Sequence, residues 1–470
     1  MSRIDSPAHR PGLLATLRES LAGGERDYTT ETIGRAVVLL AVPMVLEMLM
    51  ESAFAVADVY FVARLGVDAV AAVGQTEAMI TLIYAVAVGL SMSTTAMVAR
   101  RIGEKDRDGA ADTTVQAMGL GVVVAAAIAV PGALFAPQLL HLMGGSAELV
   151  AGGQGYTRVM LAGNVSIVLL FLLNAVFRGA GDAALAMRVL WLANGINIVL
   201  DPCLIFGWGP FPELGLTGAA VATTIGRSVG VAYQLHLLFR GRGTVAVARR
   251  HLALHGRIML RLLRISLGGI GQFLISTSSW VLLMRLVGDF GAVAVAGYTI
   301  AIRIIVVALM PSWGVSNAAA TLVGQNLGAG HPDRAAASVW RVGFYNAGFL
   351  VSVAVVFILG AERLVGLFTA EPAVIAVGAT ALRFIAYGYP FYAFGMVMTQ
   401  AFNGAGDTTT PTAINFFCYW CFQLPLALFL SHRTTLGAEG VFLAILVAEM
   451  ALTVTGILVF RRGAWRDREV

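Results

Sequence analysis

The second half of the chain repeats residues of the first half at a constant offset in residue number, which we call the repeat interval. The run Phe-Arg-Gly-Ala-Gly-Asp at 177–182 returns as Phe-Asn-Gly-Ala-Gly-Asp at 402–407, and the same repeat interval carries Gly103 onto Gly328. Because this register holds over most of the chain, we predict that its two halves are copies of one structural unit. In a strongly apolar chain, a duplication of about half the length is typical of two-lobed membrane transporters, with the substrate path between the lobes.

The composition places both copies in a lipid bilayer. Of the 470 residues, 58% are apolar and only 13% are charged, which is too few polar side chains to cover a water-soluble globule of this size. The sequence therefore predicts an all-α integral membrane protein of twelve transmembrane helices, arranged as two six-helix lobes related by a parallel pseudo-two-fold repeat. The expected spans cover residues 36–63, 69–98, 112–138, 157–177, 185–207, 215–239, 262–287, 293–323, 339–361, 378–402, 411–430 and 437–460.

The distribution of basic residues predicts the orientation. Most of the 32 Lys and Arg fall on one side of the twelve spans if both termini are cytoplasmic. We expect a prokaryotic cytoplasmic (inner) membrane protein that contacts anionic lipid and binds no nucleic acid. The predicted units are a cytoplasmic N-terminal segment at 1–34, the N-lobe at 35–239, a cytoplasmic linker at 240–257, the C-lobe at 258–461 and a cytoplasmic tail at 462–470.

The first span carries three acids where a lipid-facing helix would be apolar. Glu47, Glu51 and Asp58 fall at about 0°, 40° and 20° around a helix, so they share one narrow stripe. A carboxylate near the middle of a bilayer costs several kcal/mol unless it faces water, finds a partner or takes up a proton. Such acids are natural proton carriers, and the alternative is that they hold neighbouring helices together by hydrogen bonds.

The fifth span adds a second polar face in the same lobe. Asn194, Asn197 and Asp201 lie on one side of a helix, and Pro202 frees a backbone carbonyl one turn earlier. Oxygen ligands of this kind suit Na⁺ or a shared proton, and we keep open a Na⁺ site at Asp58, Asn197 and Asp201 without predicting any other metal. The depths of these residues predict a single cation- or proton-coupling site that is formed by Asp58, Asn197, Asp201 and Thr223.

The second lobe lacks these acids. The repeat interval converts Glu47 into Gln272 and Asp201 into Leu426. We infer that ion coupling belongs to the first lobe and that Gln272 lines the pathway from the second.

The repeated Gly-Ala-Gly-Asp loop admits an enzymatic alternative. Gly181-Asp182 and Gly406-Asp407 match the Gly-x-Gly-Asp element of intramembrane aspartyl proteases, in which two aspartates share a proton. Both aspartates fall between predicted spans, where a turn or a helix cap is the expected role. We therefore treat these four residues as a structural loop motif and predict no enzyme.

Together these residues resemble the multidrug and toxic compound extrusion (MATE) family from about Ile33 to Arg461. The segment 58–66, Asp-Val-Tyr-Phe-Val-Ala-Arg-Leu-Gly, is similar to the family's first-helix signature, and the repeated loops are similar to its paired loop motif. The segment 325–330, Gln-Asn-Leu-Gly-Ala-Gly, is similar to the end of its eighth helix.

The resemblance implies a secondary active exporter of cationic or amphipathic organic compounds, which exchanges them for H⁺ or Na⁺ by alternating access. It implies no cofactor, and we expect a monomer. Asp58, the 197–202 segment and Thr223 match the proton-coupled, DinF-like branch. The NorM-like branch relies on a seventh-helix Glu and a tenth-helix Asp, and this chain has Gln272 at the first of these and no acid around Tyr392. Glu51 departs from the pattern, which has an amide there.

Asn174 matches a further polar position of the DinF-like branch. The expected substrate or cavity lining is Glu47, Glu51, Asn174, Asn194 and Gln272. A lipid-linked saccharide flippase of the same superfamily is the remaining alternative, and it would require a cationic cavity.

Overall fold

The computed structural model describes residues 12–24, 26–241 and 243–468, and these ranges contain helices and no strand. Residues 1–11 of the predicted N-terminal segment and 469–470 of the predicted tail lie outside the described residues. The first half holds α1 (Leu13–Ala22), α2 (Ile33–Val62), α3 (Val67–Gly103), α4 (Arg107–Leu134), α5 (Ala136–Leu142), α6 (Ala147–Ala162), α7 (Asn164–Gly179), α8 (Ala183–Phe206) and α9 (Leu216–Arg240). The second half holds α10 (Gly256–Gly288), α11 (Ala292–Gly328), α12 (Pro332–Gly366), α13 (Pro372–Tyr387), α14 (Tyr389–Gly404), α15 (Thr409–Asn415), η3 (Phe416–Gln423), α16 (Leu424–Arg433) and α17 (Ala438–Arg461).

Ten helical segments of the described chain are long and apolar enough to cross a membrane, and the bent pair α13–α14 supplies an eleventh. The twelfth long segment is α9, which has 25 residues and buries polar side chains such as Arg227 and Gln234 along its length. The predicted all-α membrane architecture is confirmed. Polar residues inside α9 explain why it is the least apolar of the spans.

The helix ends reproduce the sequence repeat. The repeat interval carries both ends of α3 onto the ends of α11, and the same holds for α6 with α13 and for α7 with α14. The last helix of each lobe departs from this interval. The glycines that precede α9 and α17 are Gly215 and Gly437, with φ of 56° and 54°, whereas an unchanged interval would carry Gly215 onto Gly440. The register therefore shifts by three positions before the last helix of the second lobe.

Three expected spans are not continuous α-helices. The fourth divides into α6 and α7 at Gly163. The tenth bends by 55° between α13 and α14 at Gly388, the residue that the repeat interval relates to Gly163. Pro390 follows this bend directly and cannot donate the backbone hydrogen bond that a continuous helix needs there. The eleventh contains the π-helical segment η3, which ends just before Pro425. Insertions of this kind are common at functional sites.

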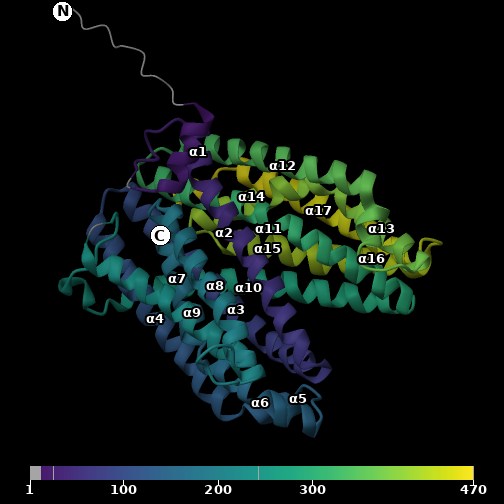
Figure 1. Cartoon of the computed structure of the whole chain (residues 1–470). Coiled ribbons are helices and arrows are strands. Elements are labelled where there is room, and N and C mark those ends of the chain that lie inside the picture. Colours follow the sequence, from purple (N-terminus) through teal and green to yellow (C-terminus); the bar gives the residue numbers. More distant parts are fainter. Residues whose placement is uncertain (1–11, 25, 242, 469–470) are drawn as a thin grey trace, which may run out of the picture.

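The two lobes meet at the end that carries α1 and the C-terminus, and they diverge away from it (Figure 1). We call these ends the converging and the diverging end. At the converging end α3 and α11 touch through glycine, because a Cβ at Gly103 would collide with the carbonyl oxygen of Gln325. The repeat-related contact also exists, since a Cβ at Gly328 would collide with the carbonyl oxygen of Arg100. The pseudo-two-fold axis therefore passes between these two contacts.

Hydrogen bonds join the lobes at the same end. Thr321 of α11 donates to the carbonyl oxygen of Arg178 at 3.0 Å, and Gln325 donates to that of Gly179 at 2.9 Å. Ser93 of α3 lies 2.8 Å from Ser266 of α10, oxygen to oxygen. These buried contacts hold the lobes together at the converging end.

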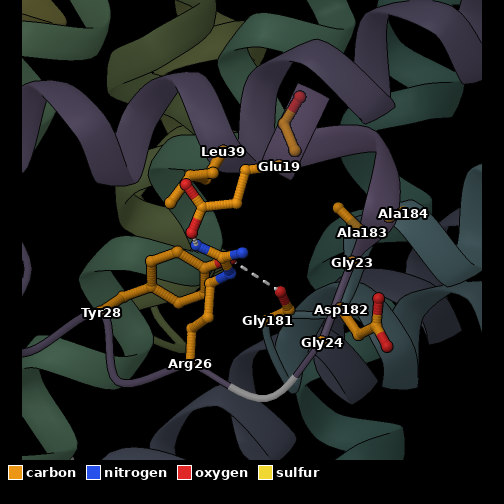
Figure 2. A pocket seen from close by; sticks show the side chains of 11 residues that line it. Glu19, Gly23, Gly24, Arg26, Tyr28, Leu39, Gly181, Asp182, Ala183 and Ala184 are labelled. Carbon is orange, nitrogen blue, oxygen red and sulfur yellow. Dashed lines mark hydrogen bonds and ion pairs between the residues drawn. The ribbon is translucent and has the colours of Figure 1, made fainter. Parts of the chain in front are cut away.

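The N-terminal segment crosses from one lobe to the other. The Tyr28 hydroxyl donates to the carbonyl oxygen of Gly181 at 3.0 Å, beside Asp182 (Figure 2), and Arg334 of α12 donates to the carbonyl oxygen of Tyr28 at 3.2 Å. α1 is fastened by Glu19, which lies 2.8 Å from Arg35 and also pairs with Arg26. The described part of this segment thus bridges both lobes.

The segment between the lobes is fastened to α4. Gln116 donates to the carbonyl oxygen of Ala253 at 2.7 Å and accepts from the backbone N–H of His255 at 3.0 Å. The chain after α17 also folds back, because the Trp465 ring stacks on Phe460 at 4.6 Å between centroids. The segment between the lobes and the C-terminal segment therefore both pack on the converging end.

Candidate cation-binding site in the first lobe

The first lobe buries a carboxylate that has no hydrogen-bond partner. Asp201 lies on α8 and is fully buried, and neither of its oxygens finds a donor among the described residues. A buried, ionised carboxylate requires a proton or a cation to compensate for the lost hydration. The structure therefore gives Asp201 the surroundings of a group that binds one of the two.

Asn197 and Thr223 lie beside each other in this region. Asn197 Nδ2 donates to Thr223 Oγ1 at 2.8 Å, and both side chains are buried. Asn197 lies one turn before Asp201 on the same face of α8. The carbonyl oxygen of the Asn197 side chain has no partner among the described residues, so it remains available as a ligand.

A glycine allows this approach of α8 and α9. A Cβ at Gly226 would come within 2.5 Å of the carbonyl oxygen of Ala193 and within 3.3 Å of the Asn197 Cβ. The missing side chain lets the two backbones pack closely, and this packing brings Thr223 within hydrogen-bonding distance of Asn197.

Asp58 joins the group from α2. It is partly exposed and lies within electrostatic range of Asp201. Both acids are in the half of their helices that approaches the diverging end. The structure thus brings Asp58, Asn197, Asp201 and Thr223 into one region of the first lobe.

Arg227 is a cation that sequence reasoning left without a role. It is 6% exposed and donates to the Tyr84 hydroxyl at 3.0 Å, while its Nη1 has no hydrogen-bond partner in the described chain. It interacts electrostatically with Asp58 and Glu51. Its position one helical turn after Thr223, on the same face of α9, was the signal that could have placed it at the site.

Glu51 lies between Glu47 and Asp58 on α2. Asn194 of α8 donates to Glu51 Oε2 at 3.0 Å. The predicted lining residues Glu51 and Asn194 therefore bond to each other, next to Arg227.

Glu47 belongs to a different group from Asp58, although the two were predicted to share one stripe. Arg178 Nη1 donates to Glu47 Oε1 at 2.8 Å, and Asn174 donates to the same oxygen at 3.2 Å. Asn174 in turn accepts from Gln234 at 2.6 Å. Glu47 and Asn174 are thus buried in a packed network near the converging end. Eleven residues of helix separate Glu47 from Asp58, about 16 Å along the axis, and angular position alone did not reveal this.

Gln272 repeats this arrangement without charge. It donates to Asn403 Oδ1 at 3.0 Å and to the carbonyl oxygen of Thr408 at 3.1 Å. The repeat interval relates Gln272 to Glu47 and Asn403 to Arg178. The ion pair of the first lobe therefore has an amide pair as its counterpart, and Gln272 is buried in that pair.

The loop motif forms two equivalent turns. Asp182 accepts from the backbone N–H of Leu185 at 3.1 Å, and Asp407 accepts from that of Thr410 at 3.2 Å. Gly181 and Gly406 precede them with φ of 92° and 81°, a region that favours glycine. Each aspartate accepts from a backbone N–H in the first turn of the following helix, and the two lie in different lobes.

Comparison with known proteins agrees with this architecture. The MatE family model matches residues 43–203 and 270–429, which fall on the two repeats. The chain belongs to the MatE family. Its members are transporters, so the chain is a membrane transporter and the protease alternative is excluded. The MATE resemblance inferred from the motifs is confirmed.

Individual relatives cover nearly the whole chain. The chain is 28% identical over 445 residues to a probable multidrug resistance protein NorM of Thermotoga maritima, covering 93% of this chain and 94% of that protein. It is 25% identical to an FAD transporter of Shewanella oneidensis, covering 90% and 93%. A solved structure described as the outward-facing conformation of a multidrug resistance MATE family transporter has a TM-score of 0.87 and 28% identity, covering 94% and 98%.

Proposed function

We propose that this MatE transporter is a secondary active exporter of cationic or amphipathic organic compounds, driven by inward movement of H⁺ or Na⁺. The observation that carries the proposal is Asp201, whose buried carboxylate has no partner among the described residues and lies within electrostatic range of Asp58. Two acids that share one site favour binding of a small cation or a proton, because both cannot remain ionised without cost.

The coupling residues in this proposal are Asp58, Asn197, Asp201 and Thr223, as in the DinF-like branch. Asn197 Oδ1 and the Asp201 oxygens supply oxygen ligands that suit Na⁺, and either acid alone can carry a proton. Coupling requires only that the ion and the organic compound favour different conformations of the two lobes.

The packing of the lobes supports alternating access. The contacts between α3 and α11 close the converging end, and the distribution of basic residues supports a location of that end in the cytoplasm of a prokaryotic cell. The state described here would then face outward, in line with the outward-facing structure that it resembles. Opening toward the cytoplasm would require these contacts to separate. We expect the exporter to work as a monomer.

The test is reconstitution of the full chain into liposomes with an imposed proton or sodium gradient. The measured quantity is transport of the cationic dye ethidium across the liposome membrane. Wild-type protein should move dye under one of the two gradients. Asp58→Asn and Asp201→Asn should abolish the dependence on the gradient, whereas Asp68→Asn, on α3 outside the site, should not. Unchanged gradient-driven transport in both site variants would contradict the proposal.

A second candidate is the export of anionic compounds. Arg227 places a buried guanidinium beside the acids, and one relative, the FAD transporter of Shewanella oneidensis, is named for an anionic dinucleotide. A cation with an unsatisfied N–H can bind a carboxylate or phosphate of a substrate. The same liposomes loaded with FAD distinguish the two candidates, because Arg227→Gln should abolish FAD movement only if the guanidinium binds it.

A further inference from the structure

Glu449 is a buried acid in the second lobe, far along the chain from the coupling residues. It lies on α17, is 3% exposed, and its Oε1 accepts a hydrogen bond from the Tyr419 hydroxyl at 2.9 Å. The groups that act on it electrostatically within the described chain include no Lys, Arg or His. An acid buried in a membrane protein without a cationic partner is stable only when a proton or another cation neutralises it.

The groups around Glu449 are hydroxyls and a thiol. Tyr392 of α14, and Tyr419 and Cys418 of η3, are the titratable side chains that face it from the helices packed against α17. Two further tyrosines, Tyr298 and Tyr389, lie within electrostatic range of Tyr392. The hydroxyls of these last two are fully buried and have no hydrogen-bond partner among the described residues. The core of the second lobe thus contains tyrosine hydroxyls that form no hydrogen bond with the described residues around them.

The internal repeat gives Glu449 a counterpart. Glu449 lies twelve positions after Gly437, and Arg227 lies twelve positions after Gly215, the glycine at the equivalent helix start. Equivalent positions of the two lobes therefore carry opposite charges. Each charge is hydrogen-bonded to a tyrosine of a neighbouring span, Tyr84 in the first lobe and Tyr419 in the second.

The surroundings of the two positions differ in one respect. Arg227 interacts with acids of its own lobe, including Asp58 and Glu51, so its charge is balanced there. Glu449 has no such balance from the described side chains. A positive charge that neutralises Glu449 must therefore come from solution, as a proton or another small cation.

Tyr419 of the π-helical segment η3 connects Glu449 with the surface of the described chain. Its hydroxyl donates to the carboxylate, and its side chain is partly exposed. A proton that reaches the Tyr419 hydroxyl is one hydrogen bond away from the carboxylate. A Na⁺ ion would need several oxygen ligands, and only one carboxylate is present among the described groups around it.

We propose that Glu449 is a second proton-binding site, located in the second lobe and reached through Tyr419. The use of this proton in transport rests on the proposed function, but its binding does not. Glu449 binds a proton in the closed core of the lobe and releases it when water reaches Tyr419 and η3. The exporter would then carry one site of exchangeable positive charge in each lobe.

The test is infrared difference spectroscopy of the full-length protein in lipid nanodiscs during a pH titration, read at the protonated-carboxyl band. Glu449→Gln should remove one titrating component, because glutamine keeps an oxygen to accept the Tyr419 hydrogen bond but cannot bind the proton. Asp58→Asn should leave that component in place. Tyr419→Phe should change its midpoint, which a carboxyl unrelated to Tyr419 would not show.

Transport measurements then separate the two proposals. Glu449→Gln should change the number of protons exchanged per dye molecule in liposomes. If neither the wild-type protein nor any variant transports dye, the proposed function fails. The infrared result still shows whether Glu449 binds a proton. A titration of Glu449→Gln that matches wild type at every pH would overturn the second site, and so would an unchanged midpoint in Tyr419→Phe.

Discussion

Asn197 on α8 donates a hydrogen bond to Thr223 on α9 across 2.8 Å, and both side chains are buried. Thr223→Val keeps the side-chain shape and removes the acceptor, so the Asn197 amide loses its partner. We expect a loss of about 1–3 kcal/mol in the free energy of unfolding, the usual cost of an unsatisfied buried donor. Thermal unfolding in detergent measures it. Thr224→Val is the matched control, because that hydroxyl bonds within its own helix, to Ala220; equal losses in both variants would contradict the assignment.

Asp201→Asn should separate stability from coupling. The substitution replaces a fully buried acid that lacks partners among the described residues by a neutral side chain of the same shape. The variant has no carboxylate whose burial costs hydration free energy. The midpoint of its thermal unfolding at neutral pH should therefore equal or exceed that of wild type. Binding of Na⁺ or H⁺ should be lost, as measured by the ion dependence of that midpoint. A variant that is much less stable would show that Asp201 is a structural acid.

Glu47→Gln should destabilise the first lobe by about 3 kcal/mol, because it leaves the partly buried Arg178 without its carboxylate. The second lobe contains the neutral version of the same contact, Gln272 with Asn403. The double variant Glu47→Gln with Arg178→Asn copies that pair and should recover part of the loss. A double-mutant cycle of thermal unfolding measures the coupling, and additive losses would contradict a direct interaction.

Gly328→Ala should weaken the contact of the lobes at the converging end. The added Cβ would collide with the carbonyl oxygen of Arg100, and a backbone atom cannot move aside as a flexible side chain can. We expect a larger population in which α3 and α11 are separated, measured as longer distances between spin labels on the two helices. Gly119→Ala is the control, because a Cβ placed there would meet no neighbouring helix of the described chain within 4 Å. Unchanged distances in Gly328→Ala would show that this contact does not hold the lobes together.

Acid should release α1 from the converging end. Hydrogen bonds from Arg35 and then Arg26 hold the pKa of Glu19 below its ordinary value of 4.5. A lowered folded-state pKa stabilises the attachment above the ordinary value, and this contribution is lost as the pH falls through the folded-state value. The protection factors of the α1 amides, which remove the intrinsic pH dependence of hydrogen exchange, should therefore fall in acid. Glu19→Gln should show low protection at every pH, and a wild-type-like acid transition in this variant would assign the effect to another group.

Much of the fold was predictable, because apolar length and the repeat interval each constrain it strongly. A turn or a helix cap was expected for the loop aspartates Asp182 and Asp407, because both fall between apolar runs, and each accepts a hydrogen bond from a nearby backbone N–H. The bend near Gly388 and the π-helical segment η3 were not predicted. Both depend on prolines, Pro390 and Pro425, whose effect inside a membrane helix depends on the neighbouring helices.

The candidate site was partly predictable. Helical spacing alone placed Asn197 and Asp201 on one face, whereas the approach of Asp58 and Thr223 rests on which helices adjoin. Glu47 shows the limit of such reasoning: its angle matches Asp58, but its partner Arg178 is set by the packing of α7 against the interior of the lobe. No role was predicted for Arg227, because one charge in an apolar helix does not reveal its neighbours.

The placement of Gly103 and Gly328 on either side of the symmetry axis has a mechanical consequence. The seam between the halves contains these close glycine contacts and also a buried apolar cluster that joins α2 to α11. A rocking motion about that axis would have to separate both. Substitutions on this seam should therefore retune such a motion, whereas substitutions deep inside one half should not.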